Sequence, residues 1–117
     1  MPSRRALGQV SLLVIVLLAP VLSSAQEAAL SGAVTDATGG VLPGVVVRAV
    51  NDANGNSFEA VTDAGGVYRI VARIGTYRVE AELAGFAPLE RRGLQLQVGQ
   101  QAVVNLQMSP AALQESV

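Results

Sequence analysis

Beyond residue 26, apolar and polar positions alternate with a period of two almost everywhere, which is the pattern of β-strands that bury one face. From Thr76 to Leu83, every odd position is apolar, whereas Arg78, Glu80 and Glu82 occupy even positions. A helix would not separate these residues so cleanly, because its faces repeat about every 3.6 residues. The alternation predicts strands at residues 30–35, 45–50, 57–62, 67–72, 76–83, 94–98 and 102–108, with an edge segment at 89–91.

Turn signals separate these segments at intervals of about ten residues, which is typical of Greek-key sandwiches and small barrels. The segments 94–98 and 102–108 are divided by a break of a few residues and are predicted to pair as a hairpin. The resulting fold class is all-β, with about seven strands and a signal-peptide helix in front.

Two glycine-rich stretches, TDATGG at 35–40 and TDAGG at 62–66, raise the question of a phosphate-binding loop. Such a loop usually precedes a helix, whereas both stretches lie between predicted strands and match no phosphate-binding pattern. We therefore interpret them as turns, in which Asp36 and Asp63 accept hydrogen bonds from nearby backbone N–H groups. Gly39 and Gly66 would supply the positive φ values that other residues avoid.

Two further turns are predicted on the same grounds. Pro43 presets φ for a turn in which Gly44 occupies the left-handed region. Asn54 and Gly55 form the Asn-Gly pair that accepts positive φ at both central positions of a tight hairpin turn.

A calcium site is the alternative use of these loops, with Asp36, Asp52 and Asp63 as weak candidate ligands. Calcium takes about six to eight oxygen ligands, and no single loop offers more than one carboxylate. Only convergence of separate loops would build a site, so turn capping is the preferred interpretation.

The aromatic residues are few, and three of them follow the apolar side of their strands. Phe58, Tyr68 and Tyr77 are predicted to pack in the core, with the tyrosine hydroxyls hydrogen bonded. Phe86 is the residue least committed to the core and is the one candidate for an exposed sugar platform.

The N-terminal segment has the order of features of a secretory signal peptide. Arg4 and Arg5 precede an apolar stretch from Val10 to Leu22, and small residues follow up to Ala25. A membrane anchor is the rival interpretation, but the apolar stretch falls short of the roughly 20 residues that cross a bilayer. We expect a signal peptide at residues 1–25, one domain at 26–108, and a linker or tail at 109–117.

Composition narrows the function classes. The chain has no cysteine, histidine or lysine, so it lacks a disulfide, the commonest general base and a Schiff-base lysine. After residue 25, six arginines face nine acidic residues, a formal charge of 6 − 9 = −3, which argues against nucleic acid. We therefore expect no enzymatic activity, no cofactor and no small-molecule substrate. The arginines are expected to form exposed ion pairs with acidic residues on neighbouring strands.

Three stretches carry a resemblance to a known family. SGAVTDATGGVLPGVVVRA (31–49), TDAGGVYRI (62–70) and GTYRVEAELAGF (75–86) resemble, in order, the motifs of the carboxypeptidase regulatory-like domain, a transthyretin-like (prealbumin-like) sandwich. With the last predicted strands, the resemblance covers nearly all of residues 27–108. Ile74 departs from the proline that the family usually has before its Gly-x-Tyr strand.

The resemblance implies a non-catalytic accessory or interaction domain, of the kind found at the N-terminus of TonB-dependent outer-membrane receptors. The implied partner is another envelope protein or an adjoining plug and barrel domain, in the periplasm or outer membrane. The chain would then be a truncated receptor or a free-standing exported module. A secreted module that binds glycan or peptide is the alternative.

Overall fold

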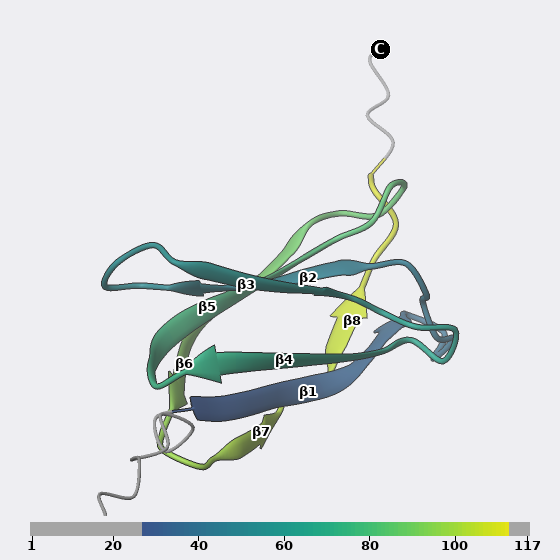
Figure 1. Ribbon diagram of the computed structural model, residues 1–117. Coiled ribbons are helices and arrows are strands. Elements are labelled where there is room, and N and C mark those ends of the chain that lie inside the picture. The colour runs from purple at the N-terminus through teal and green to yellow at the C-terminus, as the bar shows by residue number, and fades with distance from the viewer. Residues whose placement is uncertain (1–26, 113–117) are drawn as a thin grey trace, which may run out of the picture.

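The computed structural model describes residues 27–112, which form two four-stranded β-sheets packed face to face (Figure 1). No helix occurs in this part of the chain, so it contains none that could span a membrane. The predicted signal peptide lies outside the described residues. The strands are β1 (Glu27–Asp36), β2 (Val46–Asn51), β3 (Ser57–Val61), β4 (Val67–Arg73), β5 (Gly75–Glu82), β6 (Leu89–Leu96), β7 (Gln101–Val103) and β8 (Leu106–Met108).

The first sheet, called here the β1 sheet, is built around β1. On one side β1 pairs antiparallel with β4 along seven residues. On its other side β1 pairs in parallel with β7 and then with β8. Two short strands thus share one edge of β1, with a break between them.

The second sheet, called here the β2 sheet, has the order β3-β2-β5-β6, and all its strands are antiparallel. The connections β1–β2, β3–β4, β4–β5 and β6–β7 each carry the chain from one sheet to the other. This arrangement confirms the predicted all-β sandwich. Eight strands replace the expected seven or so, because residues 102–108 are divided into β7 and β8.

The predicted hairpin between residues 94–98 and 102–108 is wrong. β6 pairs with β5 in one sheet, whereas β7 and β8 pair with β1 in the other. The turn between them bridges the two sheets, because the Gly99 N–H donates to the Glu27 carbonyl at 3.0 Å and Ala29 N–H donates to the Gln100 carbonyl at 2.9 Å. A short turn after an alternating strand is compatible with a hairpin within one sheet and with a crossover between two sheets. The hydrogen bonds to β1 show that this turn is a crossover.

The core lies between the sheets and follows from the alternation. In β4 every second residue is buried, and β5 buries Tyr77, Val79 and Ala81 in the same way. Burying each large apolar side chain contributes about 1.5–3 kcal/mol. The largest fully buried side chains are Tyr68, Tyr77, Leu30, Leu106, Met108, Val34, Val45, Val47 and Val79.

Residues at the end of the described chain are attached to the loop between β5 and β6. Ala87 N–H donates to the Ser109 carbonyl at 2.8 Å, and Ala111 N–H donates to the Gly85 carbonyl at 3.0 Å. Residues 109–112, which were predicted to be linker or tail, therefore follow the sandwich in a defined direction (Figure 1). Residues 113–117 lie outside the described part.

The break between β7 and β8 brings the backbone of Val104 against Gly32 of β1. A Cβ atom placed on Gly32 would lie 2.0 Å from the Val104 carbonyl oxygen, which is far inside contact distance. The same carbonyl accepts a hydrogen bond from the Tyr68 hydroxyl at 2.6 Å. Asn105 Oδ1 replaces a missing backbone partner by accepting the Ala33 N–H at 2.9 Å. We call this set of contacts the β1 seam.

Substitution Gly32→Ala should destabilise the protein by about 3 kcal/mol, because the added methyl group meets backbone that cannot rotate away. The matched control is Gly65→Ala, whose new Cβ atom would make an ordinary 3.5 Å contact with Asp63. Urea unfolding followed by far-UV circular dichroism gives both values. Equal midpoints for the two variants would contradict the steric role of Gly32.

Candidate functional site

The two outer faces of the sandwich differ in how their charges are arranged. On the β2 sheet, a row of alternating charges crosses all four strands, and we call it the ion-pair row. Arg48 Nη2 lies 2.9 Å from Glu59 Oε2 on β3, and Arg48 Nη1 lies 3.4 Å from Glu80 Oε1 on β5. The row continues from Glu80 through Arg78, Glu90 and Arg92.

The register of the sheet explains the row. Arg48 lies directly opposite Glu59 and Glu80, whereas Glu80 lies opposite the like-charged Glu90. Arg78 relieves that repulsion, since its Nε lies 2.9 Å from Glu80 Oε2 and 3.5 Å from Glu90 Oε2. The predicted cross-strand ion pairs are thus present for Arg48 and Arg78, whereas Arg92 pairs with Glu90 of its own strand.

These contacts shift the pKa values of two groups in the ion-pair row. The hydrogen bond from Arg78 lowers the pKa of Glu80, and the hydrogen bond to Glu59 raises the pKa of Arg48. Both groups therefore stay ionised over the physiological pH range. The charges of the ion-pair row neutralise one another and are costly to desolvate, which makes the row a poor surface for an apolar partner.

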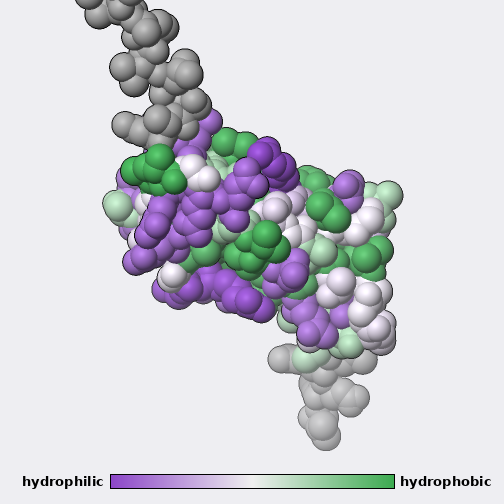
Figure 2. Space-filling model, turned by 90° about the horizontal axis from the view of Figure 1, so that it is seen from below, coloured by the Kyte–Doolittle hydropathy of each residue, from purple (hydrophilic) through white to green (hydrophobic). Residues whose placement is uncertain are grey.

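The outer face of the β1 sheet has a different character. The middle of its central strand presents small side chains outward, at Ala29, Ser31 and Ala33. The flanking strands present exposed valines, with Val71 45% and Val103 68% exposed. Figure 2, which views this side of the molecule, shows apolar groups gathered near the middle of the face and bordered by polar ones.

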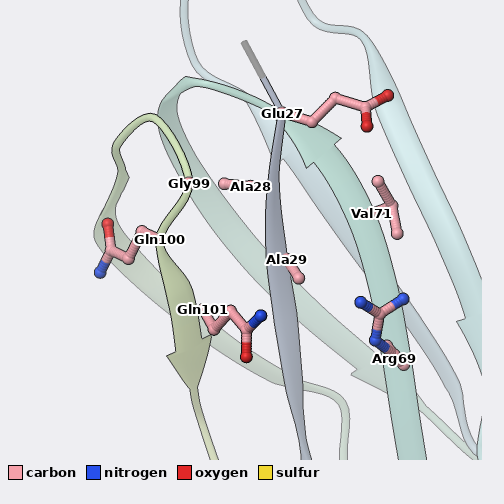
Figure 3. Close-up of a pocket in the computed structure, with 8 residues that line it drawn as sticks. All are labelled: Glu27, Ala28, Ala29, Arg69, Val71, Gly99, Gln100 and Gln101. Carbon is pink, nitrogen blue, oxygen red and sulfur yellow. The ribbon is translucent and has the colours of Figure 1, made fainter. Parts of the chain in front are cut away.

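A shallow hollow of ≈ 240 Å³ lies on this face over Ala29. Figure 3 shows Gln101 of β7 and Arg69 of β4 extending toward β1 from its two sides, with the Glu27 carboxylate near the β4 end and Gln100 pointing away. The hollow exists because alanine fills little space between longer neighbours. Its full lining is Glu27, Ala28, Ala29, Arg69, Val71, Gly99, Gln100 and Gln101.

The two aspartate–glycine stretches form capped turns. Asp36 Oδ1 accepts hydrogen bonds from Thr38 N–H at 2.8 Å, Thr38 Oγ1 at 2.7 Å and Gly40 N–H at 2.9 Å. These bonds, first that of the Thr38 hydroxyl, lower the pKa of Asp36. Gly39 has a φ of 91°, as the turn requires.

The second turn repeats this chemistry. Asp63 Oδ1 accepts hydrogen bonds from Gly65 N–H at 2.9 Å and Val67 N–H at 3.0 Å, and Gly66 has a φ of 76°. A strand follows each turn, and no helix starts there.

The calcium candidates are not brought together. Asp36 and Asp63 serve in adjoining turns, where Val34 N–H donates to the Gly66 carbonyl. Asp52 lies beside Arg78, at 3.9 Å, in the loop after β2. Within residues 27–112, no three acidic side chains lie close enough to hold a metal ion.

The other predicted turns are present, with one correction. Gly44 follows Pro43 with a φ of 80°, and Gly55 has a φ of 76°. Asn54 does not have a positive φ, so the tight Asn-Gly turn was wrong. Instead, Asn51 begins a longer loop, in which its carbonyl accepts the Gly55 N–H at 2.8 Å and its side chain accepts the Ala53 N–H.

The aromatic residues occupy the positions expected from the alternation. Tyr68 and Tyr77 are 2% and 0% exposed, and their hydroxyls donate to the carbonyls of Val104 and Arg73. Phe58 is half-buried on the edge strand β3, with its ring centroid 6.2 Å from that of Tyr77. Phe86 is also partly buried and packs against the core, so it does not form an exposed platform.

Sequence reasoning missed the features that distinguish the β1 sheet. The alternation did show the outward positions of β4, where valines and arginines alternate on the solvent side: Val67, Arg69, Val71 and Arg73. The buried Thr62 was also missed; its Oγ1 accepts the Val45 N–H and donates to the Leu42 carbonyl. A threonine at the end of a strand, just before a capped turn, is a weak signal for this bridging role.

Residues 29–109 match the family model of the carboxypeptidase regulatory-like domain. The chain belongs to this family. The match covers both sheets of the domain, including the β1 seam. No curated protein matches the chain by sequence.

Solved structures with the same fold include enzymes. Chlorocatechol 1,2-dioxygenase from Pseudomonas putida is 13% identical, with a TM-score of 0.56 over 76% of this chain and 61% of that one. Hydroxyquinol 1,2-dioxygenase from Pseudomonas putida DLL-E4 is 12% identical, with a TM-score of 0.61 over 77% and 58%. A candidate carbohydrate-binding protein from Bacteroides uniformis is 21% identical, with a TM-score of 0.58 over 71% and 41%.

The chain spans less than two thirds of the length of each of these structures, and identities at this level show the fold alone. The prediction of no enzymatic activity is contradicted at the level of the fold, because the same sandwich occurs in dioxygenases and does not by itself exclude catalysis. The prediction relied on the missing histidine, cysteine and lysine. Carboxylates and tyrosines also transfer protons in enzymes, and this domain contains both.

Tyr68 provides a test of the core by pH. Burial raises the pKa of Tyr68 to about 12, above the usual value of 10.0. The unfolded chain therefore releases this proton first, so stability is lost as the pH rises from 10 to about 12. At pH 7, Tyr68→Phe should cost about 1–2 kcal/mol, because the Val104 carbonyl loses its donor.

Between pH 10 and 12, the advantage of wild type over Tyr68→Phe should shrink by up to about 2 kcal/mol. Urea unfolding of both proteins at several pH values measures this difference. A constant difference across that range would show that Tyr68 is not held in its neutral form by the fold.

Proposed function

We propose that this chain is an exported interaction module that binds a protein partner through its β1 sheet. The difference between the two outer faces is the observation that carries this proposal. On the β2 sheet, the charges of the row satisfy one another. On the β1 sheet, Arg69 has no ion pair within the described residues, and Val71 and Val103 are exposed. A protein partner would cover the valines and supply the missing charge.

The proposed setting is the cell envelope. The signal-like features of residues 1–25 and the family match support an exported domain that resembles the N-terminal extension of a TonB-dependent outer-membrane receptor. In that setting the role is positional, and the partner is a periplasmic protein or a neighbouring plug and barrel domain. The attachment of residues 109–112 to the β5–β6 loop would set the direction of a following segment.

A second candidate function is the binding of a glycan in the hollow over Ala29. Its planar polar groups at Glu27, Arg69 and Gln101 suit sugar hydroxyls, and one structure with this fold belongs to a candidate carbohydrate-binding protein. Titration of the purified chain with soluble polysaccharides would favour this candidate if Gln101→Ala abolished binding. A titration without binding would leave the protein-partner proposal as the better one.

The proposal predicts that contact with the partner maps to one face. A photo-reactive benzoylphenylalanine is introduced at Val103 on the β1 sheet or at Val61 on the β2 sheet, in cells of a bacterium that exports the chain. The two valines are matched, being 68% and 58% exposed. We expect a discrete cross-linked species from position 103 and none from position 61.

Two outcomes would contradict this proposal. The first is equal cross-linking from both positions. The second is a chain that stays uncleaved in the cytoplasm, since the proposal requires export with processing near Ala25. N-terminal sequencing of the protein from a periplasmic extract tests the second point.

A further inference from the structure

We infer that the free edge of β4 is the docking site, and that it takes an acidic, extended peptide segment of the partner by strand addition. The inference deepens the proposed function and rests on it. Strand addition supplies main-chain hydrogen bonds from the sheet edge and specificity from alternate side chains.

Three of the four edges carry features that discourage another strand. The edge formed by β7 and β8 consists of two three-residue strands interrupted at Val104. The edge strand β6 has a register shift against β5, adjacent Arg91 and Arg92, and Gly93 at a φ of 79°. The edge strand β3 has five residues, and its central Glu59 is tied to Arg48.

The fourth edge, β4, has none of these features. It has seven residues that pair with β1 in an unbroken register, and its residues alternate regularly between exposed and buried. Figure 1 shows β4 running as a straight strand along one side of the β1 sheet. A regular, uninterrupted edge is the kind that accepts a further strand.

The ladder fixes which backbone groups of β4 face outward. Val34 N–H donates to the Gly66 carbonyl, so this pair is a hydrogen-bonded pair of the antiparallel ladder. Hydrogen-bonded and non-bonded pairs alternate, which directs the N–H and C=O groups of Arg69 and Val71 away from β1. On β1 the same alternation holds, because Ala29 N–H donates to the Gln100 carbonyl on the opposite side.

The outward groups at the two ends of β4 are partly occupied. Val67 N–H donates to Asp63 Oδ1, and the Val67 carbonyl accepts the Asp63 N–H. At the other end the Arg73 carbonyl accepts the Tyr77 hydroxyl. Between these ends, Arg69 and Val71 offer two donors and two acceptors, which is enough to pair with a short strand.

The charged side chains of β4 indicate which residues an added strand should carry. Arg69 and Arg73 lie on the outer side of β4, and their partners on β1 are Ser31 and Glu27. Neither arginine forms an ion pair within residues 27–112. An added strand with acidic residues opposite the arginines and an apolar residue opposite Val71 would complement this edge. A second copy of β4 would bring four arginines onto one face, so it is disfavoured as the occupant.

The test uses the purified chain and two synthetic peptides with valine at the position facing Val71 and threonine at the positions in between. One peptide carries glutamate at the positions facing Arg69 and Arg73, and the control peptide carries lysine there. Amide shifts in two-dimensional NMR spectra report the site and the Kd. We expect the glutamate peptide to bind with shifts centred on residues 67–73, and the lysine peptide to bind at least about tenfold more weakly.

Matched variants separate the backbone and charge contributions. Val71→Pro removes an outward N–H without removing a bond to β1, and it should abolish binding; Val61→Pro makes the same change on β3 and should leave binding intact. Arg69→Glu should weaken binding of the glutamate peptide about tenfold and strengthen binding of the lysine peptide. Arg92→Glu is the charge-matched control on β6, with an expected change below about twofold. Thermal melts confirm that each variant is folded.

Several results would overturn the inference. They are absence of glutamate-peptide binding, shifts centred on β3 or β6, equal binding by the Arg69→Glu variant, or a homodimer that Val71→Pro dissociates. If the peptide fails to bind while cross-linking from Val103 persists, the proposed function stands and only the β4 site falls. If the peptide binds but the chain is not exported, the β4 site stands as a property of the fold and the proposed function falls.

Discussion

The sandwich depends on the close approach of the Val104 backbone to Gly32 in the β1 seam. No other residue type fits at position 32, since a Cβ atom would lie 2.0 Å from the Val104 oxygen. The approach lets the chain pair with β1 twice, before and after the break, while Asn105 and Tyr68 satisfy the groups that the break leaves over. The Tyr68 bond is partly buried, and it matters because a carbonyl left unpaired away from water costs about 1–3 kcal/mol. The seam thereby joins the last strands of the chain to the first.

The seam also decides which edges of the molecule remain open. By pairing β7 and β8 with one side of β1, it covers that side with short, interrupted strands. The other side of β1 pairs with β4, which becomes the terminal strand of the sheet. An internal requirement for packing at Gly32 therefore leaves the most regular edge of the domain at β4. The core and the proposed docking edge are therefore linked through β1.

Much of the fold could be predicted from the sequence, because period-two alternation reports directly which side of a strand is buried. The capped turns at Asp36 and Asp63 were also predictable, since their chemistry is local to four or five residues. The pairing partners of β6 could not be predicted from the sequence, because the pattern within a strand does not say which sheet the strand joins. The loop at Asn54 was misjudged for a local reason, since Asn51 organises a longer loop than the Asn-Gly pair alone indicates.

The candidate site was harder to predict than the fold, since it depends on charges that lack a partner. The six arginines of the domain look alike in the sequence, and only the strand register separates Arg48 and Arg78, which lie in the ion-pair row, from Arg69.

Exposed ion pairs contribute little to stability, so the main consequence of the row concerns association. A partner that covered the β2 sheet would have to remove water from several paired charges, and Val61 is the exposed large hydrophobic residue there that would offset this cost. On the β1 sheet, burial of Val71 and Val103 would favour association, and a carboxylate of the partner would find Arg69 free to pair. The two faces of one sandwich thus differ in their charges and edges, and the fold alone does not determine function, since related sandwiches occur in dioxygenases and in a candidate carbohydrate-binding protein.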